Sequence, residues 1–174
     1  MLMYDNGLIL GRFQGLHKGH QALINTALEN CRKVLVLIGS SDKSGTVRDP
    51  FTYELRERMI RELYGDRIIV APLPDIGVGD APAWGDYVLE KGRKVLGEDI
   101  CAIVCGNETK YHLWFPDKPD LSLVKLDRAE IPISASELRS FILKDDYRAF
   151  CSHTDERMHR YYGVMRGILC VINS

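Results

Sequence analysis

The sequence feature that most constrains the fold is a short, uninterrupted apolar run of strand length. Residues 34–38 read Val-Leu-Val-Leu-Ile, without a polar residue at alternate positions. A strand with one face in water alternates apolar and polar side chains, so this run predicts a strand that is covered on both faces. Such strands are typical of parallel sheets with helices packed on both sides.

The succession of segments extends this prediction to most of the chain. We expect strands at 7–11, 33–39, 67–71, 100–105 and 121–126, and helices at 19–30, 52–63, 82–96 and 134–143. Because strands and helices alternate, the predicted fold class is α/β, a doubly wound parallel sheet in three α/β/α layers. Ligands of such sheets bind beyond the carboxyl ends of the strands, where the strand order reverses. We therefore expect the site in the loops after the first and fourth strands.

Length and spacing indicate how the chain is divided. A chain of 174 residues is long enough for one domain with a full core and too short for two domains of enzyme size. We expect a main domain over residues 1–150 and a helical extension over residues 151–174 that packs on the same domain. Apolar residues at spacings of three to four predict a helix in the extension: Met158, Tyr161, Tyr162, Met165, Leu169 and Ile172.

The charges nearly cancel, which excludes several classes of partner. The chain has 23 basic and 24 acidic residues, for a formal net charge of -1. A nearly neutral protein has no global field that attracts nucleic acid, so we expect no nucleic-acid partner and a local anion site. The sequence has no apolar run of bilayer length and no signal-like N-terminus, which predicts a cytoplasmic protein without a membrane partner.

The cysteines and isolated histidines do not predict a metal site. Five cysteines, odd in number and scattered, fit a reducing compartment. Cys101 and Cys105 flank three apolar residues, and we favour buried thiols over zinc ligands because no second ligand pair follows at usable spacing. His112, His153 and His159 show no metal spacing either, so we expect no metal ion held by protein side chains.

A loop that contains glycines and histidines follows the first predicted strand. Residues 11–20 read Gly-Arg-Phe-Gln-Gly-Leu-His-Lys-Gly-His and lead into an amphipathic helix. The unpaired amides and the dipole of a helix start form a phosphate site, and Gly19 lets phosphate oxygens approach the backbone. His17 and His20 lie on one side of this turn and can both reach one phosphate chain. The alternative, a pair of surface or capping histidines, stays open here.

A second helix start occurs late in the chain. Residues 133–139 read Ile-Ser-Ala-Ser-Glu-Leu-Arg. Ser134 and Glu137 have the spacing of a capping box, which is by itself a sufficient explanation for Ser134. Ser136 and Arg139 would add a hydroxyl and a guanidinium to the first turn, where they complete an anion-binding helix start. Two such starts indicate a polyphosphate between them.

Together the two segments resemble the nucleotidyltransferase superfamily that carries His-x-Gly-His and Ile-Ser-Ser-Thr-x-x-Arg signatures. Within it the chain is similar to the compact, archaeal-type nicotinamide mononucleotide adenylyltransferases. The similarity runs from about residue 7 to residue 148 and includes Ile-Gly-Ser-Ser at 38–41, Arg-Asp-Pro-Phe-Thr at 48–52, Glu-Arg-Met-Ile at 57–60, Pro-Asp-Ile at 74–76, Trp84 and Gly106-Asn107. The resemblance implies a Rossmann-like nucleotidyltransferase domain over residues 1–150. It also implies that ATP and nicotinamide mononucleotide give NAD and pyrophosphate, with Mg²⁺ assisting.

The resemblance further implies roles for residues at matching positions. The residues that would carry catalysis, by binding the triphosphate and stabilising charge at the α-phosphorus, are His17, His20, Arg12 and Arg139. The residues that would bind ATP phosphates are Gly19, Arg48, Ser134 and Ser136. The residues that would bind nicotinamide mononucleotide are Trp84, which stacks on the ring, Asp75 and Asn107. The resemblance also implies self-association into a homo-oligomer.

Structural alternatives stay open for three of these residues. Arg48 lies in a polar loop and could be solvated, Trp84 could be an ordinary hydrophobic anchor, and Asp75 could cap its loop. Other nearby residues receive no ligand role: we expect core or subunit contacts for Trp114 and Phe115, and solvated side chains for Lys43 and Lys110.

The chain departs from the family pattern at three places. Gly15-Leu16 stands where Pro-Phe is common, and Ala135 stands where Ser or Gly is common. Asp80-Ala81-Pro82-Ala83 precedes Trp84 where the family typically has an asparagine close by, which leaves the second substrate more open than the reaction class. A glycine loosens the loop before His17. Two other functions therefore stay open. One is a sister nucleotidyltransferase that uses a flavin, pantetheine or alcohol phosphate, and the other is a nucleotide sensor that binds without turnover.

Overall fold

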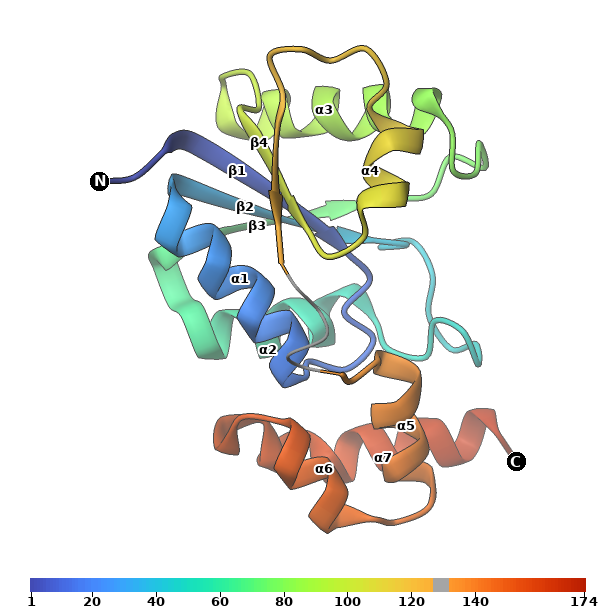
Figure 1. Cartoon of the computed structure of the whole chain (residues 1–174). Helices are drawn as coiled ribbons and strands as arrows, with labels where there is room; N and C mark the ends of the chain where they lie inside the picture. The colour runs from blue at the N-terminus through green and yellow to red at the C-terminus, as the bar shows by residue number, and fades with distance from the viewer. Residues whose placement is uncertain (127–131) are drawn as a thin grey trace.

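A parallel sheet lies at the centre of the structure, between layers of helices (Figure 1). The computed structural model describes residues 1–126 and 132–174. The strands are β1 (Tyr4–Gly11), β2 (Cys31–Gly39), β3 (Ile69–Leu73), β4 (Ala102–Cys105) and β5 (Ser122–Lys125). The α-helices are α1 (Lys18–Asn30), α2 (Tyr53–Tyr64), α3 (Pro82–Leu96), α4 (Glu108–Trp114), α5 (Ala135–Leu143), α6 (Tyr147–His153) and α7 (Tyr162–Ile172). The described residues also form the short 3-10 helices η1 (Gly65–Arg67) and η3 (Glu156–Tyr161).

The strand order is β3-β2-β1-β4-β5, and every strand pair is parallel. The chain crosses from β1 to β2 through α1, whereas β4 pairs with the other edge of β1. The strand order therefore reverses between β1 and β4, and the loops that follow these strands diverge at this point. The predicted doubly wound parallel sheet in three layers is confirmed.

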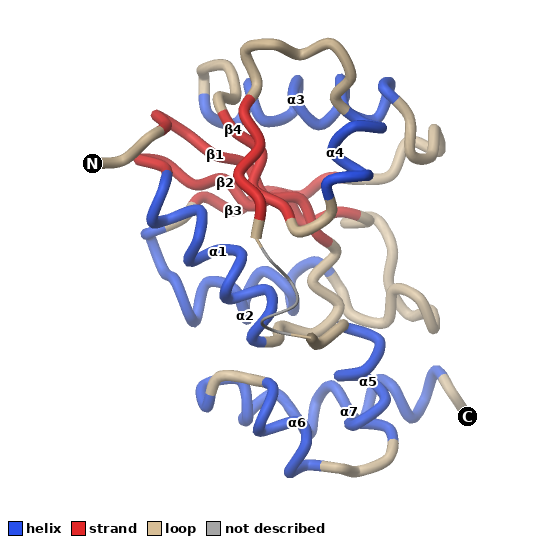
Figure 2. The backbone as a smooth tube through the Cα atoms, viewed as in Figure 1, coloured by secondary structure: helices blue, strands red, loops and turns tan. Residues whose placement is uncertain are grey.

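Strand β2 shows why its sequence is apolar at every position. Val34, Val36 and Ile38 belong to one buried apolar cluster, and Leu35 and Leu37 belong to a second one. All five side chains are at most 1% exposed. Successive side chains of a strand point to opposite faces, and Figure 2 shows α1 and α2 on one side of the sheet and α3 and α4 on the other. The two helix layers thus bury both faces of the strand.

The C-terminal residues contribute to the larger of these two clusters. Met158, Tyr161, Met165 and Leu169 are buried in the same apolar cluster as Ile9 of β1. The helix expected over this segment begins at Tyr162, because the residues before it form the tighter turns of η3. Helices α5, α6 and α7 lie together at one end of the molecule (Figure 1). Over the described residues, we find no helix with the length and hydropathy to span a membrane.

Several local features differ from the sequence expectations. Strand β3 begins at Ile69 rather than at residue 67, because Gly65–Arg67 form η1. Helices α4 and α6 were not predicted, and with seven residues each they are too short to display a helical period. Cys101 and Cys105, expected as buried thiols, are only half-buried.

Helix α3 packs against the end of α4 through a glycine. An added Cβ at Gly85 would lie 1.7 Å from the carbonyl oxygen of Trp114, which is closer than atoms can approach. We therefore expect Gly85→Ala to lower the free energy of unfolding by about 2 kcal/mol, because the two helices must separate. Urea denaturation measures this change.

The matched control is Gly167→Ala in α7, where an added Cβ meets nothing within 4 Å. Alanine has the higher helix propensity, so this control is expected to raise the free energy of unfolding by up to about 1 kcal/mol. A Gly85→Ala protein as stable as the Gly167→Ala protein would contradict the close packing of α3 on α4.

Candidate active site

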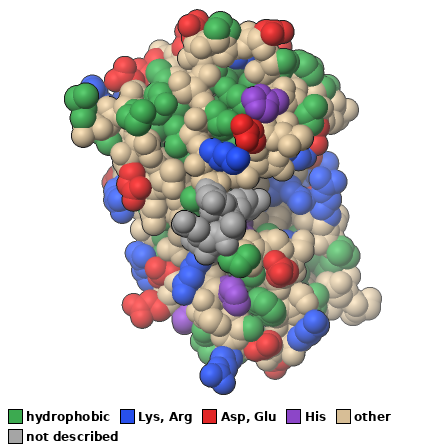
Figure 3. Space-filling model, in the orientation of Figure 1, with side chains coloured by type: hydrophobic (Ala, Val, Ile, Leu, Met, Phe, Trp, Pro, Cys, Tyr) green, Lys and Arg blue, Asp and Glu red, His purple; other side chains and the backbone are tan. Residues whose placement is uncertain are grey.

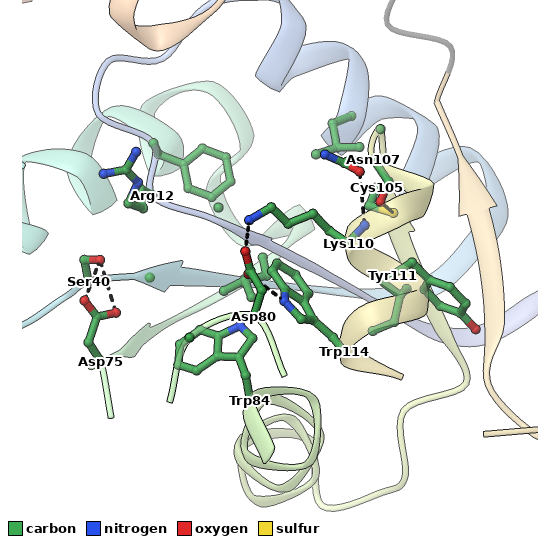
Figure 4. Close-up of a pocket in the computed structure, with 18 of the residues that line it drawn as sticks. Arg12, Ser40, Asp75, Asp80, Trp84, Cys105, Asn107, Lys110, Tyr111 and Trp114 are labelled. Atoms are coloured by element: carbon green, nitrogen blue, oxygen red, sulfur yellow. Dashed lines mark hydrogen bonds and ion pairs between the residues drawn. The ribbon is translucent and has the colours of Figure 1, made fainter. Parts of the chain in front are cut away.

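A cavity of about 740 Å³ lies at the carboxyl ends of β1, β2 and β4 (Figure 4). Its wall comes from the segments that follow the five strands, from the starts of α1 and α3, and from α4. Of the predicted site residues, the following line it: Arg12, Gly19, His20, Arg48, Asp75, Trp84 and Asn107. His17, Ser134, Ser136 and Arg139 are not among the described residues that line it. The cavity occupies the expected switch point of the sheet.

The start of α1 is closed by a reciprocal pair of hydrogen bonds between two histidines. The backbone N–H of His20 donates to Nδ1 of His17 at 3.2 Å, and the backbone N–H of His17 donates to Nδ1 of His20 at 3.5 Å. The two rings stack with their centroids 3.8 Å apart. Because both Nδ1 atoms accept a hydrogen bond, a neutral ring carries its proton on Nε2.

These contacts separate the roles of the two histidines. His17 is 1% exposed and is the N-cap of α1, so the capping alternative describes its side chain in this structure. His20 is partly exposed and lines the cavity. Of the two histidines, only His20 is among the described residues that line the cavity, and a phosphate contact by either one stays a prediction.

The start of α5 has the predicted capping box. The backbone N–H of Glu137 donates to Oγ of Ser134 at 3.2 Å, and the backbone N–H of Ser134 donates to Oε2 of Glu137 at 2.8 Å. These hydrogen bonds lower the pKa of the Glu137 carboxyl group. Ser134 and Ser136 are both exposed, and a phosphate contact by either hydroxyl stays a prediction.

The starts of α1 and α5 lie side by side, although they are far apart in the sequence. Nη1 of Arg139 donates to the carbonyl oxygen of Gln14, in the loop that leads into α1, at 3.0 Å. An added Cβ at Gly19 would lie 3.5 Å from Cγ2 of Ile133, just before α5. Figure 1 shows the two starts at the same end of α1. The structure therefore brings Arg139 to the loop that leads into α1, whose first turn contains His20.

Basic side chains gather where these elements meet. Nη1 of Arg12 pairs with Oδ1 of Asp49 at 3.1 Å, and the Asp49 carboxylate is 5% exposed. Burial lowers the pKa of the Arg139 guanidinium, and the positive charge of Arg12 lowers it further. Arg48 is exposed and lines the same cavity. A polyanion bound here would relieve the repulsion between these cations.

A buried arginine that was not predicted from the sequence lies beneath the cavity. Arg56 of α2 is 0% exposed, and burial lowers the pKa of its guanidinium. Its Nη1 donates to the carbonyl oxygens of Arg12 and Gly39, both at 2.8 Å. Its Nη2 donates to the carbonyl oxygen of Ser40 at 3.1 Å, and its Nε donates to that of Thr52 at 3.2 Å.

Arg56 thus joins the ends of β1 and β2, from which two cavity residues, Arg12 and Ser40, project. A signal for it was present in the sequence. The position lies on the same stripe of α2 as Met59, Ile60 and Leu63, where an apolar residue is expected. A charged residue on such a stripe is buried only when its hydrogen bonds are satisfied.

Asp75 joins the loops after β2 and β3. It accepts hydrogen bonds from Oγ of Ser40 at 3.1 and 3.2 Å and pairs with Nζ of Lys43 at 2.6 Å. Partial burial opposes ionisation of Asp75, but the hydrogen bonds from Lys43 and Ser40 outweigh it and lower its pKa. Ser40 adopts a φ of 47°, a strained conformation for a residue other than glycine. Lys43, expected to be solvated, is therefore part of the cavity wall.

Aromatic residues form the opposite end of the cavity. Trp84 lies in the first turn of α3 after Pro82, as predicted, and its ring centroid is 6.5 Å from that of Trp114, in an edge-on arrangement. Asn107 is the N-cap of α4, and its Oδ1 accepts a hydrogen bond from the backbone N–H of Lys110 at 3.1 Å. Trp114 packs on the second apolar cluster, as expected for a core contact, and it also lines the cavity. Lys110, expected to be solvated, lines the cavity as well.

The described residues contain no group of three or more His, Cys, Asp or Glu side chains that could hold a metal ion. Two carboxylates that line the cavity are instead paired with cations, Asp75 with Lys43 and Asp80 with Lys110. A divalent ion at this site would therefore need ligands from a bound polyanion as well.

Comparison with known proteins gives concordant results. Residues 8–157 match the family described as cytidylyltransferase-like. The chain is similar to the nicotinamide-nucleotide adenylyltransferase of Saccharolobus solfataricus, with 41% identity over 90 residues that cover 48% of this chain and 51% of the relative. It is also similar to the enzyme of the same name from Thermococcus kodakarensis, with 37% identity over 143 residues that cover 79% and 72% of the two chains. The chain spans about half the length of the first curated relatives that it matches.

A solved structure has the same fold. It is a bifunctional NMN adenylyltransferase/ADP ribose pyrophosphatase from Francisella tularensis, complexed with AMP and a manganese ion. The TM-score is 0.77 at 24% identity, over 98% of this chain and 52% of that chain. At this level of identity the similarity shows the arrangement of the sheet and helices.

Proposed function

The chain belongs to the cytidylyltransferase-like family, and on this premise we propose that it transfers the adenylyl group of ATP to the phosphate of nicotinamide mononucleotide. The products are NAD and pyrophosphate. The single observation that carries this proposal is the meeting of two helix starts, those of α1 and α5, through the Arg139 to Gln14 hydrogen bond of 3.0 Å. The names of the curated relatives support the choice of substrates.

The proposed reaction needs no general base. The second pKa of a phosphate monoester is about 6, so the phosphate of the mononucleotide is already ionised at neutral pH. Its oxygen attacks the α-phosphorus of ATP in line, and a new P–O bond forms as the bond to the bridging oxygen of pyrophosphate breaks. No covalent enzyme intermediate is required. The protein has to hold two polyanions in line and to neutralise the charge that develops on the α-phosphate and on pyrophosphate.

The residues at the phosphate end are suited to this task. His20 lies in the first turn of α1 and lines the cavity. Its ring would donate a hydrogen bond to a phosphate oxygen that gains negative charge in the transition state. Arg12, Arg48 and Arg139 would hold the triphosphate, and Gly19 would leave room for its oxygens. The remaining residues proposed to support ATP binding from the two helix starts are His17, Ser134 and Ser136.

Mg²⁺ enters the proposal as part of the ATP substrate. The paired states of Asp49 and Asp75 are consistent with an ion that is held mainly by phosphate oxygens. When bound, the ion supplies positive charge that stabilises the leaving pyrophosphate.

At the other end of the cavity, Trp84 would stack on the nicotinamide ring, with Asp75 and Asn107 completing the mononucleotide site. The ring of the mononucleotide is cationic, and indole is the best aromatic partner for a cation. We expect Trp84→Ala to raise KM for nicotinamide mononucleotide by about tenfold or more and to leave KM for ATP within about twofold. Steady-state kinetics with each substrate varied in turn measures both constants.

Trp84→Phe is the matched control for this prediction, because it keeps a smaller aromatic ring at the same position. Its KM for the mononucleotide is expected to lie between those of the parent and the alanine variant. Equal effects of Trp84→Ala on both KM values would reject the stacking role and favour a hydrophobic anchor.

A coupled assay of pyrophosphate release tests the proposed function against its alternatives. ATP or CTP is supplied with nicotinamide mononucleotide, a flavin phosphate, a pantetheine phosphate or an alcohol phosphate. Release that depends on ATP and nicotinamide mononucleotide is the expected result. Release with a different acceptor would identify a sister transferase, and ATP binding without release would identify a sensor.

Three further expectations join the proposal. Residues 151–174 would form an extension of the main domain of residues 1–150, which the shared cluster of Met165, Leu169 and Ile9 supports. The chain would act in the cytoplasm and would form a homo-oligomer. Light scattering of the purified protein tests the last point.

A further inference from the structure

One acidic residue of the cavity wall is held by two side chains of a neighbouring helix. Lys110 and Trp114 lie one turn apart on α4, and both contact Asp80, in the loop between β3 and α3. Nζ of Lys110 forms an ion pair with Oδ2 of Asp80. Nε1 of Trp114 donates to Oδ1 of Asp80 at 2.8 Å. Figure 4 shows these contacts, with Trp84 directly beside them.

The position of Asp80 depends on α4 rather than on its own loop. Gly77 and Gly79 adopt φ values of 73° and 66°, and an added Cβ at either would meet nothing within 4 Å. Such a loop supplies little packing of its own. The two contacts from α4 therefore fix the carboxylate at the aromatic end of the cavity. The same contacts lower the pKa of Asp80, first through Lys110 and then through Trp114, so the group is ionised at neutral pH.

We propose that the Asp80 carboxylate, held by Lys110 and Trp114, makes this cavity select an acceptor ring with a neutral carboxamide over one with a carboxylate. The inference rests on the proposed function, in which Trp84 stacks on the pyridine ring of the acceptor. A ring stacked on Trp84 places its substituent close to the Trp114 and Asp80 pair, because the two indole centroids are 6.5 Å apart. A carboxamide N–H can donate to the Asp80 carboxylate, whereas a carboxylate substituent is repelled by it.

The ion pair between Lys110 and Asp80 predicts opposite effects on the preference for amide over acid when one or the other charge is removed. The ammonium group of Lys110 forms an ion pair with the Asp80 carboxylate, so each charge offsets part of the effect of the other on a bound substituent. Removal of the aspartate charge would leave an unpaired cation at the substituent, which favours a carboxylate. Removal of the lysine charge would leave an unpaired anion, which disfavours a carboxylate further. The two variants should therefore change the preference in opposite directions.

The experiment measures kcat/KM for nicotinamide mononucleotide and for nicotinic acid mononucleotide, at saturating ATP, in the parent, Asp80→Asn and Lys110→Gln proteins. The result is the ratio of the two values, amide over acid. We expect Asp80→Asn to lower this ratio by about tenfold and Lys110→Gln to raise it by several-fold. Both shifts should shrink at high ionic strength, because the pair is partly exposed.

A second ion pair provides a matched control. Lys118 and Asp86 form an exposed pair at 2.8 Å and are not among the described residues that line the cavity. Lys118→Gln and Asp86→Asn should leave the ratio within about twofold of the parent value. The selection role would be overturned if Asp80→Asn and Lys110→Gln changed both substrates by the same factor. It would also be overturned if both variants moved the ratio in the same direction.

Dissociation constants for the two mononucleotides, measured by calorimetry with the same proteins, separate this inference from the proposed function. If the parent binds both ligands but forms no dinucleotide, the proposed function fails. The ratio of dissociation constants then still supports or overturns the selection by Asp80. A parent that binds neither mononucleotide would overturn both.

Discussion

His20→Ala is expected to lower kcat by about a hundredfold, which corresponds to about 3 kcal/mol of transition-state stabilisation. The physical reason is the place of His20 at the start of α1, where it lines the cavity and its Nδ1 accepts a backbone hydrogen bond from His17. That bond fixes the ring and leaves Nε2 as the protonated nitrogen, so the donor is oriented before the substrate binds. A donor of this kind needs no reorganisation as charge develops. Single-turnover kinetics at saturating substrates measures the loss.

His112→Ala is the matched control for this prediction, because His112 is an exposed histidine of α4 outside the described cavity wall. Its kcat is expected to stay within about twofold of the parent. The His20 variant also loses one bond of the helix cap, so its thermal unfolding has to be measured beside its kinetics. A kcat within threefold of the parent in a folded His20→Ala protein would show that His20 has no role in the transition state.

Arg56→Met is expected to lower the free energy of unfolding by about 3 kcal/mol or more. The substitution removes four hydrogen bonds that a cationic donor makes to the carbonyl oxygens of Arg12, Gly39, Ser40 and Thr52. The oxygens of Ser40 and Thr52 each keep a backbone donor, the N–H groups of Lys43 and of residue 56. Hydrogen bonds to charged groups contribute about 1.5 to 3 kcal/mol each, and the apolar burial of methionine offsets part of the loss. Urea denaturation followed by circular dichroism measures the change.

Arg58→Met is the control for Arg56→Met, since Arg58 is an exposed residue of the same helix. Its effect is expected to stay within about 0.5 kcal/mol. Arg56→Lys keeps the positive charge, but a lysine ammonium group cannot reach carbonyl oxygens that lie in three directions. We therefore expect its loss of unfolding free energy to lie between the losses of Arg58→Met and Arg56→Met. Unfolding of Arg56→Met at the same urea concentration as Arg58→Met would contradict the part assigned to the buried guanidinium.

The architecture could be predicted because its main signals are local in the sequence. The apolar run at residues 34–38 indicates burial on both faces, and in a chain whose strands and helices alternate this is typical of a parallel sheet between two helix layers. The capping box of Ser134 and Glu137 and the proline at the start of α3 were also readable from spacing alone. Short helices such as α4 were not predicted, because a helix of so few turns does not display a clear helical period in the sequence.

The composition of the site was harder to predict, because it depends on contacts between residues far apart in the chain. Asp80 and Lys110 are 30 positions apart, and their contact depends on the path of a loop with two glycines. The role of His17 depended on a ring orientation that turns its side chain to its own helix. Arg56 was visible as a charge on an apolar stripe, but its four carbonyl partners come from segments that meet only in the folded chain.

The meeting of two positively polarised helix starts on one triphosphate is the claim on which the proposed chemistry depends. A crystal structure of the protein with a non-hydrolysable ATP analogue tests it most directly, through the distances from the phosphate oxygens to His20 and Arg139. The account predicts phosphate oxygens of one triphosphate at hydrogen-bond distance, about 3 Å, from both side chains. A triphosphate that contacts the start of α1 alone, with Arg139 remote from every phosphate oxygen, would contradict it.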